Sequence, residues 1–402
     1  MASSTASAVI APPQWKAALL GFATMFSVGT VYALSSLQNA IPRLFEVSQP
    51  WSYSLFAAAC LGLTMGVGIC ASCIAAYGEY FVAIAGTALW GVAVVGVGYF
   101  LATIPSLLGV LGSLFVGGVG VGLTYLATIV LVGQAFPNQP LARSAIGPLG
   151  FSSGAGTWFA VWSHYQIGAA DVEQLQRALG IGGGTFIFTA VVSYALAPSR
   201  AAGSSTALPP HSEKTPDRRF FLMLLFCNAL PGMAAFGALF PITSFYVQEN
   251  TTTTPDILPY LMIALALGGF FSSAISNLLG ARSTFVMLFC VRSMLLITTS
   301  LSSTQSVATV TLLVMFFAHG AGFSIIPGLV KARQSKPAFF PYEYGTVLTA
   351  WGVAGIVGNA MNAAFVPLSG ETATVSLILG LVTLTFGITL YLNPAFGSLA
   401  FS

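Results

Sequence analysis

The chain has 402 residues, of which 56% are hydrophobic and only 6% are charged, with a formal net charge of +3. About a quarter of the residues in a soluble protein are charged, so this composition excludes a water-soluble domain. The small net charge gives no sign of a nucleic-acid partner. We therefore expect a multi-pass protein of the lipid bilayer.

Twelve apolar segments are long enough to cross a membrane as helices, which takes about 20 residues each. The first half of the chain holds six, at residues 14–40, 52–76, 81–103, 106–135, 143–167 and 176–197. The second half holds six more, at residues 220–247, 257–279, 283–303, 307–330, 343–367 and 374–392. A polar stretch rich in Pro and Ser separates the two sets, which is typical of a flexible linker. These features predict an all-α protein with a six-helix bundle at 1–197, a linker at 198–219 and a second six-helix bundle at 220–402.

Charged residues predict how the chain is oriented in the membrane. If the N-terminus is cytoplasmic, the cytoplasmic side carries ten basic residues: Lys16, Arg143, Arg200, Lys214, Arg218, Arg219, Arg282, Lys331, Arg333 and Lys336. The opposite side carries only Arg43 and Arg177. Cytoplasmic loops of membrane proteins are enriched in Lys and Arg, so both termini are expected in the cytoplasm. The sequence shows no targeting signal that distinguishes the plasma membrane from an organellar membrane.

The two halves of the chain share short glycine-rich patterns. The sequence GVGL at 120–123 recurs 200 residues later as GAGF at 320–323. Downstream, GFSSGAG at 150–156 is matched by GVAGIVG at 352–358. Related halves are typical of secondary transporters, and glycines at these spacings let membrane helices pack closely.

A family resemblance follows from these patterns. The residues that carry it are 118–125 (GVGVGLTY), 135–138 (AFPN), 154–156 (GAG), 316–320 (FFAHG) and 344–345 (YG). Together with the six-plus-six arrangement, they resemble the major facilitator superfamily, with a distant similarity to its oxalate/formate antiporter and monocarboxylate transporter group. The resemblance implies a monomeric transporter without metal or cofactor, in which two bundles rock around a central substrate path.

The sequence departs from that group at positions that matter for the substrate. In the loop at 75–80, Ala75 stands where the superfamily normally has an Asp. Trp351 and Gly269 stand where the oxalate branch has a Lys and an Arg that hold a dicarboxylate. A dianion without either cation would lose its hydration without compensation. We therefore expect that oxalate and other dicarboxylates are not substrates.

Polar and aromatic residues in the spans that the resemblance places along the path are candidates for substrate binding. Tyr32 and Tyr125 match aromatic cavity positions of the group, and Thr128 shares a helix face with Tyr125. Phe323 and Trp351 are expected to form an apolar wall. The alternative for each tyrosine is a ring packed between helices with its hydroxyl bound to a carbonyl.

Two titratable residues lie deep within predicted spans. His319 could carry a transported proton or bind an anion when charged, or simply replace an aromatic ring. Arg292 is the only charge deep in a span, where a cation costs at least about 2.5 kcal/mol. It could serve as a pocket cation, or it could snorkel toward the cytoplasm or hold backbone carbonyls at a helix end.

The predicted function is transport of a small organic solute by alternating access, either as uniport or coupled to protons. A monocarboxylate such as lactate, pyruvate or formate fits a site in which Tyr32 and Tyr125 donate hydrogen bonds and His319 supplies a titratable charge. One alternative is a neutral or amphipathic solute. Another is a membrane receptor or assembly partner that transports nothing. An enzyme is not expected, because no pair of acid and base groups shares a depth and no metal set or nucleotide loop is visible.

Overall fold

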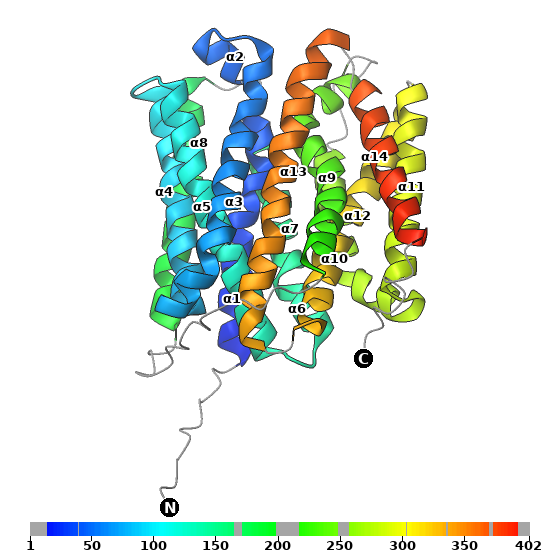
Figure 1. The fold of residues 1–402 in the computed structure, drawn as a ribbon. Helices are drawn as coiled ribbons and strands as arrows, with labels where there is room; N and C mark the ends of the chain where they lie inside the picture. The colour runs from blue at the N-terminus through cyan, green and yellow to red at the C-terminus, as the bar shows by residue number, and fades with distance from the viewer. Residues whose placement is uncertain are drawn as a thin grey trace, which may run out of the picture.

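The computed structural model describes residues 14–38, 40–164, 171–197, 217–247, 257–302, 304–334, 337–369 and 373–392. Long helices lie side by side in one layered bundle, with shorter helices at its ends (Figure 1). Residues 198–216, which form most of the predicted linker at 198–219, lie outside the described residues.

The first half begins with a helix that changes its form partway along. α1 (Gln14–Gly29) continues directly into the 3₁₀ helix η1 (Thr30–Leu37). The remaining elements of this half are α2 (Ala40–Phe45), η2 (Gln49–Tyr53), α3 (Ser54–Tyr77), α4 (Glu79–Ala102), α5 (Leu107–Ala135), α6 (Pro140–Ile146), α7 (Pro148–His164) and α8 (Val172–Leu196).

The second half is described from the start of its first long helix. Its elements are α9 (Arg218–Val247), α10 (Ile257–Leu279), α11 (Ala281–Leu301), α12 (Gln305–Ala332), the 3₁₀ helix η3 (Pro337–Phe339), α13 (Phe340–Ser369) and α14 (Ala373–Leu392). Gly280 has a φ of 77° and stands between α10 and α11, as Gly78 with a φ of 82° stands between α3 and α4. Glycine adopts this backbone conformation without strain, which allows the chain to reverse in one residue.

The predicted all-α membrane fold is confirmed, and eleven helical segments of the described chain are long and apolar enough to cross a bilayer. The predicted fifth span, at 143–167, differs most from the prediction. It divides into the short α6 and the 17-residue α7, because Gly147-Pro148 interrupts the helix between them. Pro148 has no N–H to donate, so it is tolerated at the start of the new helix. The short elements α2, η2 and η3 were not predicted either.

Glycines on α5 let neighbouring helices approach closely. A Cβ on Gly122 would lie 2.6 Å from the carbonyl oxygen of Leu63 on α3. A Cβ on Gly120 would lie 2.5 Å from that of Gly86 on α4. These contacts are too short for any other residue, which confirms that these α5 glycines are packing positions.

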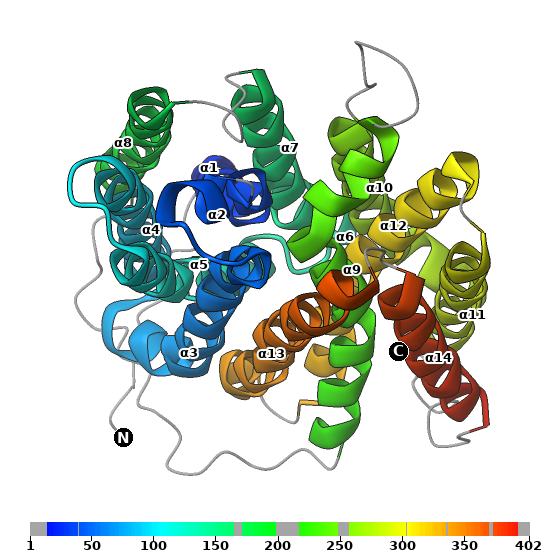
Figure 2. The same cartoon turned by 90° about the horizontal axis from the view of Figure 1, so that it is seen from above.

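The two halves meet along two pairs of helices. α3 packs against α13, and α7 packs against α10 (Figure 2). At the first contact, a Cβ on Gly352 would lie 2.6 Å from the carbonyl oxygen of Cys60. At the second, a Cβ on Gly156 would lie 3.0 Å from Cβ of Met262. Small residues therefore bring the halves together at both contacts.

The bundle has two distinct ends. We call the end at which α1 begins and α14 ends the near end, and the end at which η1 finishes the far end (Figure 1). The described chain therefore begins and ends on the same side of the bundle, and the placement of that side in the cytoplasm stays a prediction.

Candidate functional site

A cavity of about 880 Å³ lies between the two halves and reaches the loops of the near end. Its lining comes from α3, α4, α5, α6 and α7 in the first half and from α10, α12 and α13 in the second. Most of the lining is apolar, including Ile129, Val130 and Phe323. A solute in this cavity would therefore contact both halves at once.

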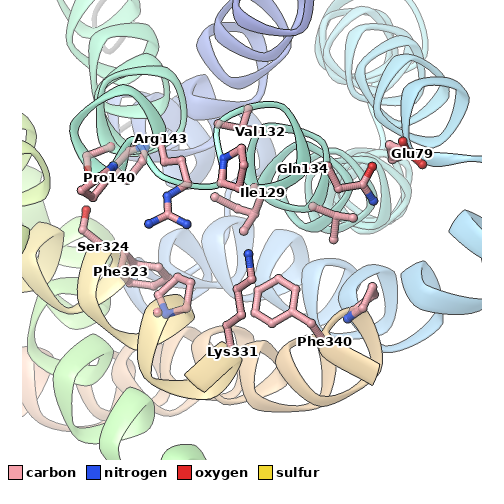
Figure 3. A pocket seen from close by; sticks show the side chains of 18 of the residues that line it. Glu79, Ile129, Val132, Gln134, Pro140, Arg143, Phe323, Ser324, Lys331 and Phe340 are labelled. Atoms are coloured by element: carbon pink, nitrogen blue, oxygen red, sulfur yellow. The ribbon is translucent and has the colours of Figure 1, made fainter. Parts of the chain in front are cut away.

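Two basic side chains enter the cavity from opposite sides. Arg143 projects from α6 and Lys331 projects from the last turn of α12, and both point into the space between the halves (Figure 3). Partial burial lowers the pKa of the Arg143 guanidinium from its ordinary value because the charged form loses hydration. The lining carries one described carboxylate, Glu79, at the start of α4.

The inner end of the cavity is closed by aromatic side chains from both halves. We call this set the aromatic cluster: Tyr32, Tyr125, Phe151, Phe236, Phe323 and Trp351. The Trp351 ring lies 4.9 Å from that of Tyr125 and 5.0 Å from that of Phe323, measured between centroids. Aromatic pairs in such geometries contribute about 0.5–1.5 kcal/mol each beyond their buried area.

The six predicted substrate-binding residues take different places around this cavity. Phe323 lines it, while Tyr32, Tyr125 and Trp351 lie behind Phe323 and are at most 3% exposed. With His319, which contacts Tyr32 and Phe323, the structure thus brings five of the six together. In this conformation the aromatic cluster forms the inner wall rather than an open pocket.

Tyr32 and His319 make a direct polar contact between the halves. The Tyr32 hydroxyl lies 3.0 Å from Nε2 of His319, and both side chains are buried. Tyr32 also stacks on Phe236 of α9, with 3.7 Å between ring centroids. The pair therefore joins η1 to α9 and α12 in the interior of the molecule.

Thr128 lies apart from the other predicted residues. Its hydroxyl forms a hydrogen bond of 3.2 Å with that of Thr24 on α1, and the side chain is fully buried. Residues three apart lie near each other on a helix but do not point in the same direction. Thr128 therefore contacts Thr24 on α1, whereas Tyr125 contacts Trp351 on α13. Thr128 consequently holds α5 against α1 inside the first half.

Arg292 is buried and bound to backbone carbonyls in the middle of α9. Its two terminal nitrogens donate to the carbonyls of Cys227 and Asn228, each at 2.9 Å. Pro231 lies four residues after Cys227 and has no N–H, so the Cys227 carbonyl lacks its usual helical donor. Arg292 replaces that donor, and it neither snorkels to an aqueous end nor lines the cavity.

Asn228 links this arginine to His319. The Asn228 side-chain amide donates to the backbone carbonyl of His319 at 3.2 Å, and the backbone carbonyl of Asn228 accepts from Arg292. A polar connection therefore runs from α11 through α9 and α12 to Tyr32 in η1. The sequence analysis did not select Asn228, although a lone amide in an apolar span with a nearby Pro signals a distorted membrane helix.

The far end is closed by further contacts between the halves. The Gln38 side-chain amide donates to the backbone carbonyl of Gly237 on α9. Gln38 is 1% exposed, and η1 and η2 pack on α9 and α13. None of the residues that line the cavity lies at this far end.

Sequence reasoning missed Arg143 and Lys331 as cavity residues because it placed both on the cytoplasmic side, at the ends of the predicted spans 143–167 and 307–330. Each stands close to a proline, Pro140 before Arg143 and Pro327 before Lys331. Pro140 starts α6 after a turn, and Pro327 lies within α12 and lines the same cavity. Prolines next to basic residues at span boundaries were the available signal that these segments bend inward.

Comparison with solved structures identifies the fold. The proton:xylose symporter XylE bound to 6-bromo-6-deoxy-D-glucose superposes with a TM-score of 0.71 at 11% identity, over 94% of this chain and 95% of that one. A single-residue variant of the E. coli fucose:proton symporter FucP gives 0.64 at 13% identity, over 93% and 98%. FucP in the outward conformation gives 0.60 at 15% identity, over 93% and 99%.

No protein-family model and no curated protein matches the sequence. The solved structures, which belong to transporters rather than enzymes, therefore carry the assignment alone. Agreement over more than nine-tenths of each chain shows a shared fold despite the low identity. The chain has the all-α, membrane-spanning fold of major facilitator superfamily transporters.

Proposed function

We propose that this protein is a secondary transporter that moves a small organic solute across the membrane by alternating access. The observation that carries the proposal is the cavity between the halves, which reaches the near end and stops at the aromatic cluster. A solute bound there touches both halves, so a rocking motion can expose it to either side. The fold shared with two solute symporters supports the same conclusion.

We propose a small monocarboxylate as the solute. The cavity lining carries Arg143, Lys331 and Glu79, which leaves an excess of positive charge in a mostly apolar space. A carboxylate with a short apolar body matches both properties. This extends the distant similarity to the monocarboxylate transporter group, and it places the positive charge at residues that the similarity does not indicate.

The aromatic cluster would form the deeper part of the binding site when the halves separate around it. Tyr125 and Tyr32 each carry a hydroxyl that can donate to a carboxylate, and Phe323 and Trp351 supply apolar faces. The solute would approach from the near end, past Arg143 and Lys331, and reach Phe323 first. The near end would face the cytoplasm, as the distribution of basic residues predicts.

Proton coupling would act through the Tyr32–His319 contact. A charged imidazole would donate from Nε2 to the Tyr32 hydroxyl, so protonation would fix the direction of this hydrogen bond and turn the hydroxyl proton toward another partner. Arg292 binds the carbonyl of Asn228, whose amide holds His319, so a charge on His319 would also meet the nearby guanidinium. Protonation would therefore loosen the closed far end.

A neutral solute is the second candidate, because the two solved structures are symporters of xylose and fucose. The aromatic cluster and its hydroxyls would suit a sugar or another uncharged, partly apolar molecule. The excess positive charge of the cavity would then have no role in binding.

The experiment is uptake by purified protein in liposomes, with labelled pyruvate and lactate, with and without an inward proton gradient. Saturable uptake driven by the gradient and reduced in His319→Gln supports proton-coupled monocarboxylate transport. Gradient-independent uptake supports uniport. Uptake of xylose or fucose in place of the acids would transfer the assignment to neutral solutes, and oxalate uptake would contradict the proposed class.

Absence of uptake of every solute tested would contradict transport itself. A receptor or assembly partner would then account for the fold. Lys16→Gln is a suitable control in each assay, because Lys16 lies at the start of α1 outside the cavity.

A further inference from the structure

Arg143 and Lys331 bring like charges into one cavity from opposite halves of the molecule. Arg143 is carried by the short helix between α5 and α7, and Lys331 by the end of α12. Their charged groups point toward the same space (Figure 3). Any motion that closes the near end must bring these two cations closer together.

Neither cation is neutralised within the described chain. No described carboxylate lies within 4.0 Å of either, whereas Arg218, Arg333 and Arg177 each have a carboxylate partner. Glu79 lines the same cavity but lies at its edge, on the side away from Arg143 (Figure 3). The serine hydroxyl of Ser276, also on the lining, has no hydrogen-bond partner in the described structure. The cavity thus holds two cations, neither of which has a described carboxylate within 4.0 Å.

We propose that Arg143 and Lys331 form a two-cation site that binds the carboxylate of the transported solute between the halves, and that this anion allows the near end to close. The proposal rests on the proposed function and specifies both the place of the carboxylate and its mechanical consequence. The solute is then the counterion that the closed near end requires.

The chemistry of the two side chains suits this task. The guanidinium of Arg143 can hold both oxygens of a carboxylate in a bidentate arrangement. The ammonium of Lys331, on a flexible stem, can follow the anion as the halves move. Without an anion the two cations repel each other, and repulsion between like charges grows as the halves approach.

The position of the pair favours a solute over an anionic lipid headgroup. The two residues line a cavity whose other walls include Ile129, Val130 and Phe323, and they lie between the halves rather than on the surface that faces lipid. An apolar body attached to the carboxylate would pack on these side chains. A headgroup would have to leave its acyl chains at the membrane and cross the loops of the near end.

The first test is carboxylate binding to purified protein in neutral phosphatidylcholine nanodiscs, which contain no anionic lipid. Lactate is the probe, and uncharged lactamide is its matched control. We expect thermal stabilisation by lactate but not by lactamide. Arg143→Gln and Lys331→Gln should each weaken lactate binding roughly tenfold to a hundredfold, because each removes a charge-assisted hydrogen bond. Arg143→Lys should retain an intermediate affinity.

Lys16→Gln removes a near-end charge outside the cavity and should leave lactate binding unchanged. If Arg143→Gln and Lys331→Gln fold normally and bind lactate as the wild type does, the two-cation site is overturned while carboxylate transport stands. If the wild type binds no carboxylate, both the site and the proposed substrate class are overturned.

The second test measures closure of the near end by the distance between spin labels at Tyr77→Cys and Leu278→Cys, in a background without the native cysteines. Both positions are exposed and lie in different halves, at the ends of α3 and α10. Lactate should shift the distribution toward shorter distances. Arg143→Glu, which places a carboxylate opposite Lys331, should produce this shift without lactate. Unchanged distances in Arg143→Glu would overturn the proposed role of charge in closure.

Discussion

The two ends of the molecule are held by different kinds of interaction. From the interior to the far end, polar groups from the two halves bind each other directly, as Tyr32 does with His319 and Gln38 does with Gly237. At the near end, Arg143 and Lys331 face each other across a cavity of about 880 Å³ without a described carboxylate partner. The far end is thus closed by groups of the protein itself. The near end would need a negative charge that the described residues do not supply.

This difference explains why the described conformation is open at the near end. Hydrogen bonds and ring stacking stabilise the closed far end without any ligand. Closing the near end without a ligand would bring two cations together in a space of reduced dielectric constant, where their repulsion is stronger than in water. The missing negative charge is what a carboxylate solute would bring.

Breaking the Arg218–Glu343 ion pair should have the largest effect on stability. Glu343 is 1% exposed, and its Oε2 accepts from Nε of Arg218 at 2.9 Å. We expect Glu343→Gln to reduce the free energy of unfolding by about 2–3 kcal/mol, less than for a fully buried pair because Arg218 is partly exposed. The measurement is the apparent Tm of the protein in detergent.

This prediction separates stability within a half from contacts between the halves, because α9 and α13 both belong to the second half. Glu173→Gln is the matched control, since it breaks an exposed pair with Arg177 at 2.9 Å. Its Tm should change little. If Glu343→Gln and Glu173→Gln lowered Tm equally, burial of Glu343 would not make its ion pair more stabilising than an exposed one.

Adding a side chain at Gly352 should disturb the contact between the halves. Gly352 on α13 faces the backbone of Cys60 on α3, and a Cβ there would lie 2.6 Å from that carbonyl oxygen. We expect Gly352→Val to cost about 1–3 kcal/mol by overpacking and to reduce solute uptake. Uptake in liposomes and Tm in detergent measure the two effects.

Gly68→Val on α3 provides the comparison, because no atom lies within 4 Å of a Cβ added there. It introduces the same β-branched residue into the same helix pair without a steric contact. Uptake lost to the same extent in both variants would mean that helix propensity, and not the approach of α3 and α13, causes the loss.

Removing the Tyr32 hydroxyl should have the smallest of these effects on stability, through the contact that Tyr32 makes between the halves. Tyr32→Phe keeps the ring stacked on Phe236 but deletes the 3.0 Å contact with His319. We expect it to weaken the closed far end by about 0.5–1.5 kcal/mol. Labelling of cysteines introduced near the far end should become faster.

Tyr53→Phe controls for loss of a hydroxyl at the same end. The Tyr53 hydroxyl is buried without a hydrogen-bond partner in the described structure, so its loss should leave the labelling rate unchanged. If Tyr53→Phe opened the far end as much as Tyr32→Phe, the Tyr32–His319 contact could not be the feature that closes it.

The fold could be predicted from the sequence because hydrocarbon thickness imposes a length on every crossing segment. The twelve apolar runs and their charge distribution therefore indicated the helices and their order. The structure differs where a local feature interrupts a run, as Pro148 does in the fifth predicted span. The change from α1 to η1 follows Gly29, but one glycine in a sequence that contains 43 does not indicate a change of helix form.

The candidate site could be predicted only in part. The aromatic residues Tyr32, Tyr125, Phe323 and Trp351 were selected through a family resemblance, and the structure brings them together. Arg143 and Lys331 were counted only as charges on the cytoplasmic side, because a sequence indicates depth along a helix but not which way a residue at its end turns. Thr128 was selected by helix spacing alone, and spacing does not distinguish the cavity from α1.

The most direct test of the account is a pair of distances measured on one protein, one at each end. Labels at Tyr77→Cys and Leu278→Cys report the near end, and labels at Trp51→Cys and Tyr260→Cys report the far end, all at exposed positions. On addition of lactate, we predict that the near-end distance shortens while the far-end distance lengthens. If both distances stay unchanged in a protein that binds lactate, or if both change in the same direction, alternating access around this cavity is contradicted.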